Sequence, residues 1–330
     1  MSRLALAIDI GGTKMAAGLV DPSGRLVERA QVPTAGEEGE PAGDGEALWH
    51  RLADLVQNVR NGVSGSDSIV VCGAGCGGPM SPGGETVSPL NIGAWRAFPL
   101  RSRLCDLTGV ATFVDNDAKA LALAEGWIGA ASGRRDFLAM VVSTGIGGGI
   151  VLDGRLLQGR LGNAGHVGHV VVEPDGRPCA CGGRGCLEAE ASGTALATIT
   201  GRPAELAAPE VVERTGTLVG RAVASVANLL DLPLAVVSGS VALGFGAPFF
   251  AAAQREVEAR CGLEFARGTR VVPGGLGDEG PLIGAARVGW VGLELGEHHH
   301  GGEGHVEGDG HGHDHGEQDG EGDDDAWVLI

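Results

Sequence analysis

Two stretches of similar design organise this sequence: IDIGGTKMAAGLVD at Ile8–Asp21 and VVSTGIGGGIVLDG at Val141–Gly154. Each places a turn of small residues between two apolar runs, a pattern that indicates two β-strands joined by a glycine-rich turn. Helical periodicity follows at Gly45–Val63, 118–131 and Val211–Leu230, and further buried strands follow at 68–75 and 234–240. The repetition indicates a duplicated unit, so we expect two α/β lobes facing a central cleft.

The composition places most of the chain among ordinary globular proteins. The 330 residues are 43% hydrophobic, 60 are glycine, and tyrosine is absent, which excludes a tyrosine acid or nucleophile. The formal net charge of −18 is unevenly spread, because residues 296–330 carry 11 of the 42 acidic residues, seven of the ten histidines and no basic residue. We expect 296–330 to be a disordered tail. A metal-handling role for it is an alternative that deleting the tail would test.

Charge and targeting signals exclude several classes of partner. The remaining residues show no basic stripe, so nucleic acid is not expected as a partner. Met1–Gly12 lacks a secretory signal, and glycine, serine and proline interrupt the longest uncharged stretch, Leu232–Ala253, so no membrane association is expected. Seven cysteines, an odd number, without an export signal predict reduced thiols and a cytoplasmic protein.

The two glycine turns are candidate phosphate sites. Backbone N–H groups of Gly11 and Gly12 can approach an anion closely, and Thr13 and Lys14 add a hydroxyl and a positive charge. Asp9, at the end of the strand, is placed to hold Mg²⁺. The second turn supplies further small residues, namely Thr144, Gly145 and Gly147. Neither turn is a P-loop, and a GxGxxG at 73–78 lacks the acidic residue and the helix of a dinucleotide site.

Three polar residues, Asp115, Asn116 and Asp117, separate an apolar strand from an alanine- and leucine-rich helix. Helix capping explains one such residue but does not require three. A carboxylate at the mouth of a cleft can take the proton of a hydroxyl that attacks a phosphoryl group. We therefore predict that one of these carboxylates acts as a general base, with Asn116 orienting the alcohol.

A cluster of cysteine and histidine lies between Gly165 and Gly193. His169 precedes Cys179, Cys181 and Cys186, a set that satisfies a tetrahedral Zn²⁺ without an open position and so predicts a structural metal. A disulfide with one spare thiol is the alternative, which a reducing compartment disfavours. His166 and Glu188 flank these residues and are polar enough to contact a substrate.

Together these motifs resemble the ROK family of sugar kinases and repressors, and bacterial ROK-type glucokinases in particular. The resemblance covers 1–295 and rests on DIGGTK, NIGAW at Asn91–Trp95, DNDA, STGIGGG and GHVGHVVVEPDGRPCACGGRGCLE. It implies an actin-like ATPase (ribonuclease H-like) fold of two lobes, with ATP, Mg²⁺ and a hexose meeting in the interlobe cleft. It also implies a homo-oligomer, either a dimer or a tetramer.

The resemblance assigns roles residue by residue. It implies Asp117 as catalytic base and His169, Cys179, Cys181 and Cys186 as ligands of structural zinc. It implies contacts to the sugar from Asn91, Asn116, His169 and Glu188, and contacts to the nucleotide from Gly239 in Ser238-Gly239-Ser240. The lobes are expected at 1–116, with a C-terminal helix at about 280–295 packing back on it, and at 117–279, which carries the zinc motif.

One position departs from the family pattern. Sugar kinases of this family usually have glutamate three residues before the zinc histidine, where this sequence has His166. A neutral imidazole accepts one hydrogen bond but lacks the charge and the second oxygen of a carboxylate. We therefore expect an ATP-dependent hexose kinase, with an N-acetylated hexosamine kinase or a catalytically weak sugar-binding sensor as alternatives. A family repressor would need a DNA-binding segment ahead of Asp9, which we do not expect.

Overall fold

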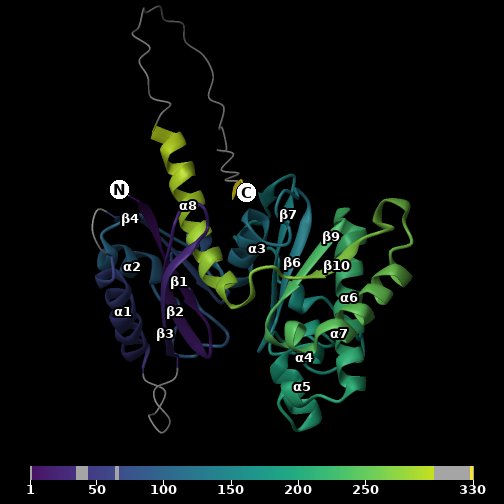
Figure 1. Ribbon diagram of the computed structural model, residues 1–330. Coiled ribbons are helices and arrows are strands. Elements are labelled where there is room, and N and C mark those ends of the chain that lie inside the picture. The colour runs from purple at the N-terminus through teal and green to yellow at the C-terminus, as the bar shows by residue number, and fades with distance from the viewer. Residues whose placement is uncertain (1, 35–43, 64–66, 301–327, 330) are drawn as a thin grey trace, which may run out of the picture.

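The computed structural model describes residues 2–34, 44–63, 67–300 and 328–329 (Figure 1). Its first sheet has the strand order β3-β2-β1-β4-β5. Strands β1, β2 and β3 are antiparallel neighbours, whereas β4 and β5 continue the sheet parallel to β1. The strands are β1 (Arg3–Ile10), β2 (Lys14–Val20), β3 (Leu26–Pro33), β4 (Ser68–Cys76) and β5 (Thr112–Asn116).

The second sheet repeats this topology. Its order is β10-β9-β6-β7-β8-β11, with β6, β7 and β8 antiparallel and β9 and β10 parallel to β6. The strands are β6 (Phe137–Val142), β7 (Ile146–Leu152), β8 (Arg155–Leu156), β9 (Leu234–Ser238), β10 (Arg270–Pro273) and β11 (Val328–Leu329). The duplication expected from the two glycine turns is therefore present in the fold.

Helices cover both sheets and meet between them (Figure 1). Helices α1 and α2 pack on one face of the first sheet, and α8 packs on the other, where Leu282, Ala285 and Ala286 meet Ala5 and Ala7. Helix α3 packs on one face of the second sheet, and α6 and α7 cover its opposite face. The helices are α1 (Gly45–Asn61), α2 (Leu100–Thr108), α3 (Asp117–Trp127), α4 (Leu187–Ala191), α5 (Gly193–Thr200), α6 (Pro209–Leu230), α7 (Ser240–Arg260) and α8 (Gly280–His300). Short 3₁₀ helices are η1 (Pro82–Gly84), η2 (Val167–His169), η3 (Ala204–Leu206), η4 (Glu264–Ala266) and η5 (Gly277–Glu279).

The predicted lobe boundary falls between two elements that belong to different sheets. Strand β5 ends at Asn116, and α3, which begins at Asp117, packs its buried alanines against the second sheet. Helices α3 and α8 contact each other along the junction. The division at 116/117 stays a prediction that this packing supports.

The glycines of the GxGxxG pattern have a packing role. A β-carbon added at Gly73 would lie 1.9 Å from the carbonyl oxygen of Ala285 in α8, so no side chain fits between β4 and this helix. Because Gly73 and Gly75 both lie within strand β4, they form no phosphate-binding turn. The rejection of a dinucleotide site is consistent with this placement.

The predicted tail needs correction at its two ends. Helix α8 continues to His300, and Val328–Leu329 form strand β11, which pairs with β8 at its open edge. Short apolar segments such as Val328–Leu329 are suited to pairing with an exposed strand. Residues 301–327 and 330, on which the rest of that prediction falls, lie outside the described residues.

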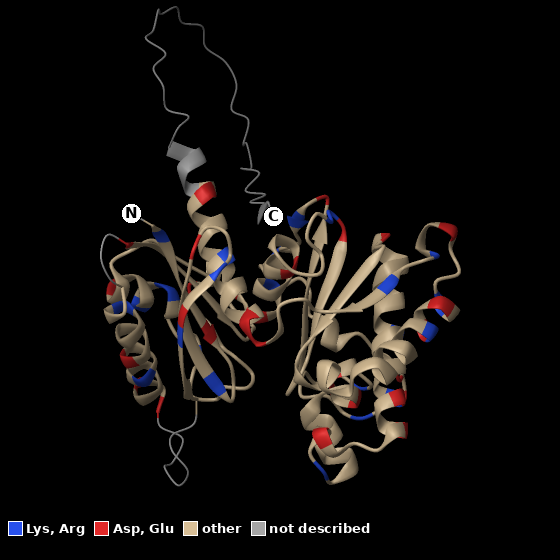
Figure 2. Cartoon of the chain, viewed as in Figure 1, with Lys and Arg blue, Asp and Glu red and all other residues tan. Residues whose placement is uncertain are grey.

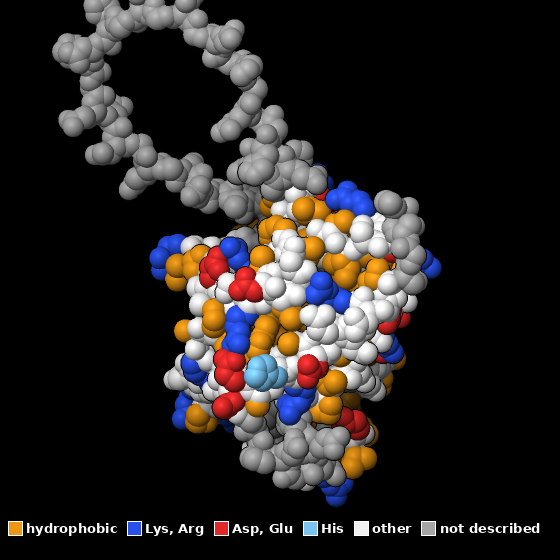
Figure 3. All heavy atoms as spheres, turned by 90° about the vertical axis from the view of Figure 1, so that its left-hand side faces the viewer, with side chains coloured by type: hydrophobic (Ala, Val, Ile, Leu, Met, Phe, Trp, Pro, Cys, Tyr) orange, Lys and Arg blue, Asp and Glu red, His pale blue; other side chains and the backbone are white. Residues whose placement is uncertain are grey.

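The described surface agrees with the charge pattern of the sequence. Acidic and basic side chains are interspersed over the first lobe, without a basic stripe across the face in view (Figures 2 and 3). None of the helices in the described part of the chain combines the length and apolar character that a membrane span requires.

Candidate active site and metal centre

The carboxyl ends of the parallel strands bring polar residues to one edge of the first sheet. Asp9 on β1 pairs in register with Gly75 on β4, and Gly75 pairs with Asp115 on β5. One residue further along, Ile10, Cys76 and Asn116 form the next row. Asp117 follows this row directly, so the sheet edge presents several carboxylates close together.

Asp117 is the first residue of α3 and is held there by capping bonds. The Oδ1 of Asn116 accepts hydrogen bonds from the N–H groups of Ala118 (3.1 Å) and Lys119 (3.3 Å). The N–H of Ala118 also donates to Oδ1 of Asp117 at 2.8 Å. Burial raises the pKa of Asp117, although hydrogen bonds from the Ala118 N–H and the Asn116 side chain oppose this. A raised pKa suits a carboxylate that must accept a proton.

The charge of Asp117 affects the pKa of Asp9. Burial and then this neighbouring carboxylate raise the pKa of Asp9 to about 7, and Lys14 opposes the shift. Two carboxylates that repel each other at a sheet edge are the donor set that a divalent cation such as Mg²⁺ relieves. The residues present therefore fit the predicted magnesium site.

The first glycine turn is braced from both sides. The Gly11 N–H donates to the carbonyl of Lys14 at 3.0 Å, and the Thr34 hydroxyl donates to the carbonyl of Gly11 at 2.7 Å. A β-carbon at Gly12 would lie 2.8 Å from Nδ2 of Asn91. Asn91 thus packs directly on the turn and also lies beside Gly77 in the loop after β4. Lys14 and Asp9 line a cavity of about 260 Å³ that reaches the start of α8.

The second glycine turn is braced by the segment that carries Glu188. The Ile146 N–H donates to Oε2 of Glu188 at 3.0 Å, and a β-carbon at Gly145 would lie 3.0 Å from the same oxygen. The Thr144 carbonyl accepts from the Thr194 hydroxyl at 3.0 Å. This turn therefore keeps its shape through contacts with the helices that follow the cysteine cluster.

Gly239 lies next to the second turn. Its φ of +98° and the 2.4 Å that would separate an added β-carbon from the Val142 carbonyl oxygen both require glycine. The adjacent Ser240 hydroxyl is 2.9 Å from that of Ser143. The Ser238 side chain instead turns inward, where its hydroxyl donates to buried Glu125 at 3.3 Å. Of the Ser238–Ser240 segment, Gly239 and Ser240 thus adjoin the turn, whereas the Ser238 side chain does not.

The start of α3 touches elements of both sheets. A β-carbon at Gly75 would lie 3.4 Å from the Cα of Asp117, and one at Gly147 would lie 2.8 Å from the Cβ of Ala118. Gly75 pairs with Asp9 beside the first turn, and Gly147 lies on β7 just after the second turn. Asp117 is therefore placed where the two turn-bearing hairpins approach each other.

His166 lies near Asn116. A β-carbon at Gly78 would be 3.4 Å from the His166 ring and 3.6 Å from Nδ2 of Asn116. Desolvation of the ring, followed by the nearby His169, lowers the pKa of His166, against the opposing charge of Glu188. The imidazole is therefore neutral near pH 7, and it can both donate and accept a hydrogen bond.

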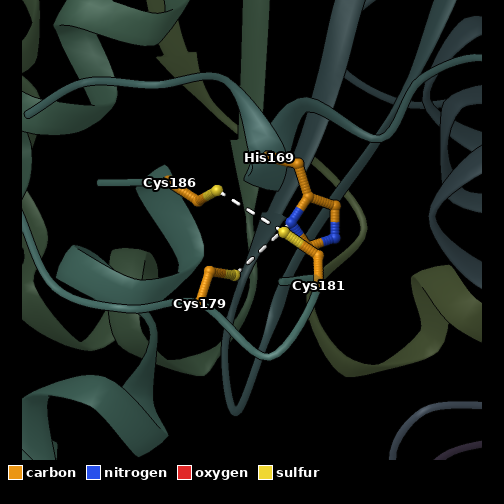
Figure 4. A group of neighbouring side chains, drawn as sticks. All are labelled: His169, Cys179, Cys181 and Cys186. Carbon is orange, nitrogen blue, oxygen red and sulfur yellow. Dashed lines mark hydrogen bonds between the residues drawn. The ribbon is translucent and has the colours of Figure 1, made fainter. Parts of the chain in front are cut away.

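The cysteine cluster has the geometry of a metal centre. The ligand atoms of His169, Cys179, Cys181 and Cys186 all lie within 4.8 Å of one another, and Figure 4 shows them converging. The Cys181 and Cys186 sulfurs are 3.7 Å apart, as are Cys179 Sγ and His169 Nδ1. Zinc–sulfur bonds of about 2.3 Å place tetrahedral ligands about 3.8 Å apart. A disulfide requires about 2.05 Å, and all seven cysteines are free, so the disulfide alternative does not describe this cluster.

A buried carboxylate holds the metal loop. Glu190 is 1% exposed and accepts from the N–H (2.6 Å) and the guanidinium (2.5 Å) of Arg177 and from Arg214 on α6 (2.7 Å). Arg177 lies two residues before Cys179, and Glu190 lies two residues after Glu188. Glu190 therefore positions the metal loop and the turn-bracing carboxylate together.

Two bridging residues were missed at the sequence level. Lys119 is 1% exposed, and its ammonium group pairs with Asp115 at 2.8 Å and donates to Gln158 and to the carbonyl of Gly162 at 3.0 Å. Asn163 exchanges hydrogen bonds with the backbone of Met80, at 3.4 and 3.2 Å. Both residues fix the segment that leads to His166. A lysine within an alanine and leucine helix was the available signal for Lys119, whereas Asn163 had none.

Comparison with known proteins gives the same family as the motifs. The model of the ROK family matches residues 5–289. The N-acetylmannosamine kinase of Citrobacter koseri is 39% identical over 256 residues, which are 73% of this chain and 84% of that protein.

Two solved structures have the same arrangement of sheets and helices. The ROK family glucokinase from Streptomyces griseus, in complex with glucose and AMPPNP, superposes with a TM-score of 0.75 at 29% identity over 87% of this chain and 99% of the other. The ROK hexokinase from Thermus thermophilus gives a TM-score of 0.70 at 33% identity over 89% and 99% of the two chains. The predicted actin-like ATPase fold is confirmed. Since the family model spans nearly all of the chain outside the tail, the chain belongs to the ROK family.

Proposed function

We propose that the protein is an ATP-dependent kinase of a hexose hydroxyl, with Asp117 as its general base. The observation that carries the proposal is the position of Asp117 at the start of α3, in contact with Gly75 beside Asp9 and adjoining Gly147 after the second turn. Kinase activity is also named for the Citrobacter and Streptomyces relatives.

Different residues are proposed to serve as the base, the sugar site and the nucleotide site. Asp117 accepts the proton of the sugar hydroxyl while the oxygen of that hydroxyl forms a bond to the γ-phosphorus of ATP. The bond between the γ-phosphorus and the β–γ bridging oxygen breaks, and ADP is released. The sugar is proposed to be held by polar side chains around Asp117, namely Asn91, Asn116, His166, His169 and Glu188. The nucleotide is proposed to be held by two sets of residues, which are Gly11, Gly12, Thr13 and Lys14 in the first lobe and Thr144, Gly145, Gly147 and Gly239 in the second. Mg²⁺ on Asp9 would supply charge neutralisation at the phosphates.

We propose zinc for the four-residue cluster. Burial and then the neighbouring Cys181 raise the pKa of Cys186 to about 12, so a thiolate there needs a cation. Because Nδ1 of His169 faces Cys179, binding of a metal leaves its Nε2 as a donor toward the sugar. The cluster would then orient His169 rather than take part in the reaction.

The test is coupled ADP release with a panel of hexoses. Asp117→Asn should lower kcat by roughly 10²–10⁴-fold, because the variant keeps the size of the side chain but cannot accept the proton. Asp54→Asn, an exposed change on α1, is the matched control and should leave turnover unchanged. Equal turnover by wild type and Asp117→Asn would refute the assigned base. If no hexose is phosphorylated but a sugar stabilises the protein, the sensor alternative is favoured instead.

N-acetylmannosamine is the second candidate substrate. A neutral imidazole at position 166 can donate to an acetamide oxygen, and the Citrobacter relative is named for this sugar. The discriminating measurement compares kcat/KM for glucose and N-acetylmannosamine in wild type and His166→Glu. A shift of preference toward glucose in the variant supports a role of His166 in specificity, whereas an unchanged ratio contradicts it.

Two further properties remain proposals. Seven free cysteines support a reducing, cytoplasmic setting. A dimer or tetramer is proposed from the family resemblance, and light scattering on the purified full chain would measure the assembly.

A further inference from the structure

A second cavity lies away from the residues discussed above, where α3, α8 and the β7–β8 hairpin meet. It encloses about 460 Å³ and is lined by Trp127, Ser132 and four arginines, Arg134, Arg135, Arg155 and Arg287. Asp117 begins α3 and Trp127 ends it, so the length of the helix, about 15 Å, separates this cavity from the proposed base. The cavity also adjoins the end of β7 opposite to the second glycine turn.

Positive charge exceeds negative charge at this cavity. Among the described residues of the lining, Asp153 is the one acidic residue, and it pairs with Arg135. Arg134 and Arg155 are exposed and have no ion pair with any residue that the structure describes. In Figure 2, basic positions lie beside acidic ones on the ribbon at the upper end of β7. On a chain with a net charge of −18, such a local excess of arginine favours an anionic ligand.

Arg287 adds a largely buried positive charge to the lining. Its guanidinium lies 5.2 Å from the ring centroid of Trp127 and pairs with Glu294 at 3.1 Å, and its side chain is 12% exposed. Its Nε is buried without a hydrogen-bond partner among the described residues. This atom is closed to the cavity, so Arg287 contributes the positive charge of its guanidinium to the lining and not a hydrogen bond from Nε.

The arginines stand on a fixed backbone. The β7–β8 turn has positive φ at Asp153 (51°) and Gly154 (73°), the geometry of a tight hairpin. The Gly154 N–H donates to the Arg135 carbonyl at 2.8 Å, and the Asp153 N–H donates to Asp136 at 2.7 Å. Arg135 and Arg155 are therefore held on two adjoining segments, and little ordering is needed when a ligand binds.

We propose that this cavity binds the phosphate group of a small phosphorylated metabolite or free phosphate. Guanidinium groups match phosphate oxygens in geometry and charge, and the volume suits a small molecule. Arg287 belongs to α8, which packs on the first sheet, and Arg155 belongs to β8 of the second sheet. A bound phosphate therefore connects elements of both lobes. The inference does not depend on the proposed reaction.

The experiment is calorimetric titration of the full chain with inorganic phosphate and, separately, with glucose 6-phosphate, at constant ionic strength. A non-hydrolysable ATP analogue and glucose, both in excess, occupy the proposed nucleotide and sugar sites, so that the titrated ligands report on the second cavity. Both ligands should bind saturably at one site, and tighter binding of the sugar phosphate would identify a phosphorylated metabolite as the ligand. The double variant Arg134→Ala/Arg155→Ala should weaken binding at least about tenfold for each arginine removed, whereas the exposed change Arg202→Ala should not.

Two results would overturn the inference. One is saturable binding that the double variant leaves unchanged, which would place the phosphate elsewhere. The other is absence of binding to the full chain. Because Arg134 and Arg155 are exposed, the double variant is expected to fold, and its circular dichroism spectrum checks this.

Discussion

Replacing Asp9 by asparagine should make the metal-free protein more stable at alkaline pH while it abolishes the proposed magnesium site. Burial, followed by the charge of Asp117, raises the pKa of Asp9 from 3.8 to about 7. Between these two values the unfolded chain has lost the proton that the folded chain still binds. Stability from protonated Asp9 is therefore complete below pH 3.8 and is lost as pH rises through about 7. Asparagine carries no charge and removes this loss.

The magnitude follows from the shift of the pKa. A shift of about three units corresponds to about 4 kcal/mol, at about 1.4 kcal/mol for each unit. Asp9 is partly exposed, and solvent screening reduces the effect, so we expect a gain of about 2–4 kcal/mol at pH 8. The gain should become small near pH 4 and vanish below it, where Asp9 is protonated in both the folded and the unfolded chain. Asp117→Asn should give part of the same gain, because its charge is the second cause of the shift.

The assay is urea unfolding of wild type and Asp9→Asn in EDTA, from pH 4 to pH 8, with Asp54→Asn as the matched exposed control. Added Mg²⁺ should then restore stability to wild type at pH 8 but leave Asp9→Asn unchanged, because only the carboxylate binds the cation. A difference between the two proteins that does not vary with pH would show that Asp9 and Asp117 do not share one electrostatic site. That outcome would remove the support for the proposed phosphoryl-transfer centre.

Three further predictions concern the scaffold of the site. Cys181→Ser should lose zinc, as measured by elemental analysis. Cys105→Ser, which is also exposed but lies outside the cluster, should retain one zinc per chain. Equal zinc contents in the two variants would contradict the metal assignment. Glu190→Gln should lower the free energy of unfolding by about 2 kcal/mol near pH 7, since it weakens bonds to two half-exposed arginines. Burial alone would raise the pKa of Glu190, but hydrogen bonds from Arg177 and Arg214 outweigh it and lower the pKa. The difference in unfolding free energy between Glu190→Gln and wild type should therefore shrink as pH falls below 4.5. A difference that stays constant with pH would count against an ionised Glu190. Gly73→Ala should lower the free energy of unfolding by about 1–3 kcal/mol, measured with heat or urea, because the added carbon would lie 1.9 Å from the Ala285 carbonyl oxygen. Gly262→Ala, whose added carbon would meet nothing within 4 Å, should be nearly neutral. Similar stabilities of the two variants would refute the packing role of Gly73.

The local elements and the family followed from the sequence because their causes lie within short stretches of chain. Alternating and continuous apolar runs around Gly11 and Gly145 specify strands that need a tight turn, and periodic apolar residues specify α1 and α6. The spacing of Cys179, Cys181 and Cys186 restricts which ions the loop can surround. These patterns were sufficient to predict two similar lobes and the metal cluster, and the resemblance of the motifs to the ROK family implied the actin-like fold.

The tertiary structure alone decided which distant residues meet. Asp9 and Asp117 are 108 positions apart, and only the register of β1, β4 and β5 makes their charges interact. Asn163 reaches Met80, and Arg287 reaches the cavity beside Arg155, through packing between separate elements. A sequence pattern records local backbone preferences, whereas such contacts depend on how complete sheets and helices pack. For that reason the sequence identified the chemical groups, and the packing of the two lobes determined their electrostatic environment.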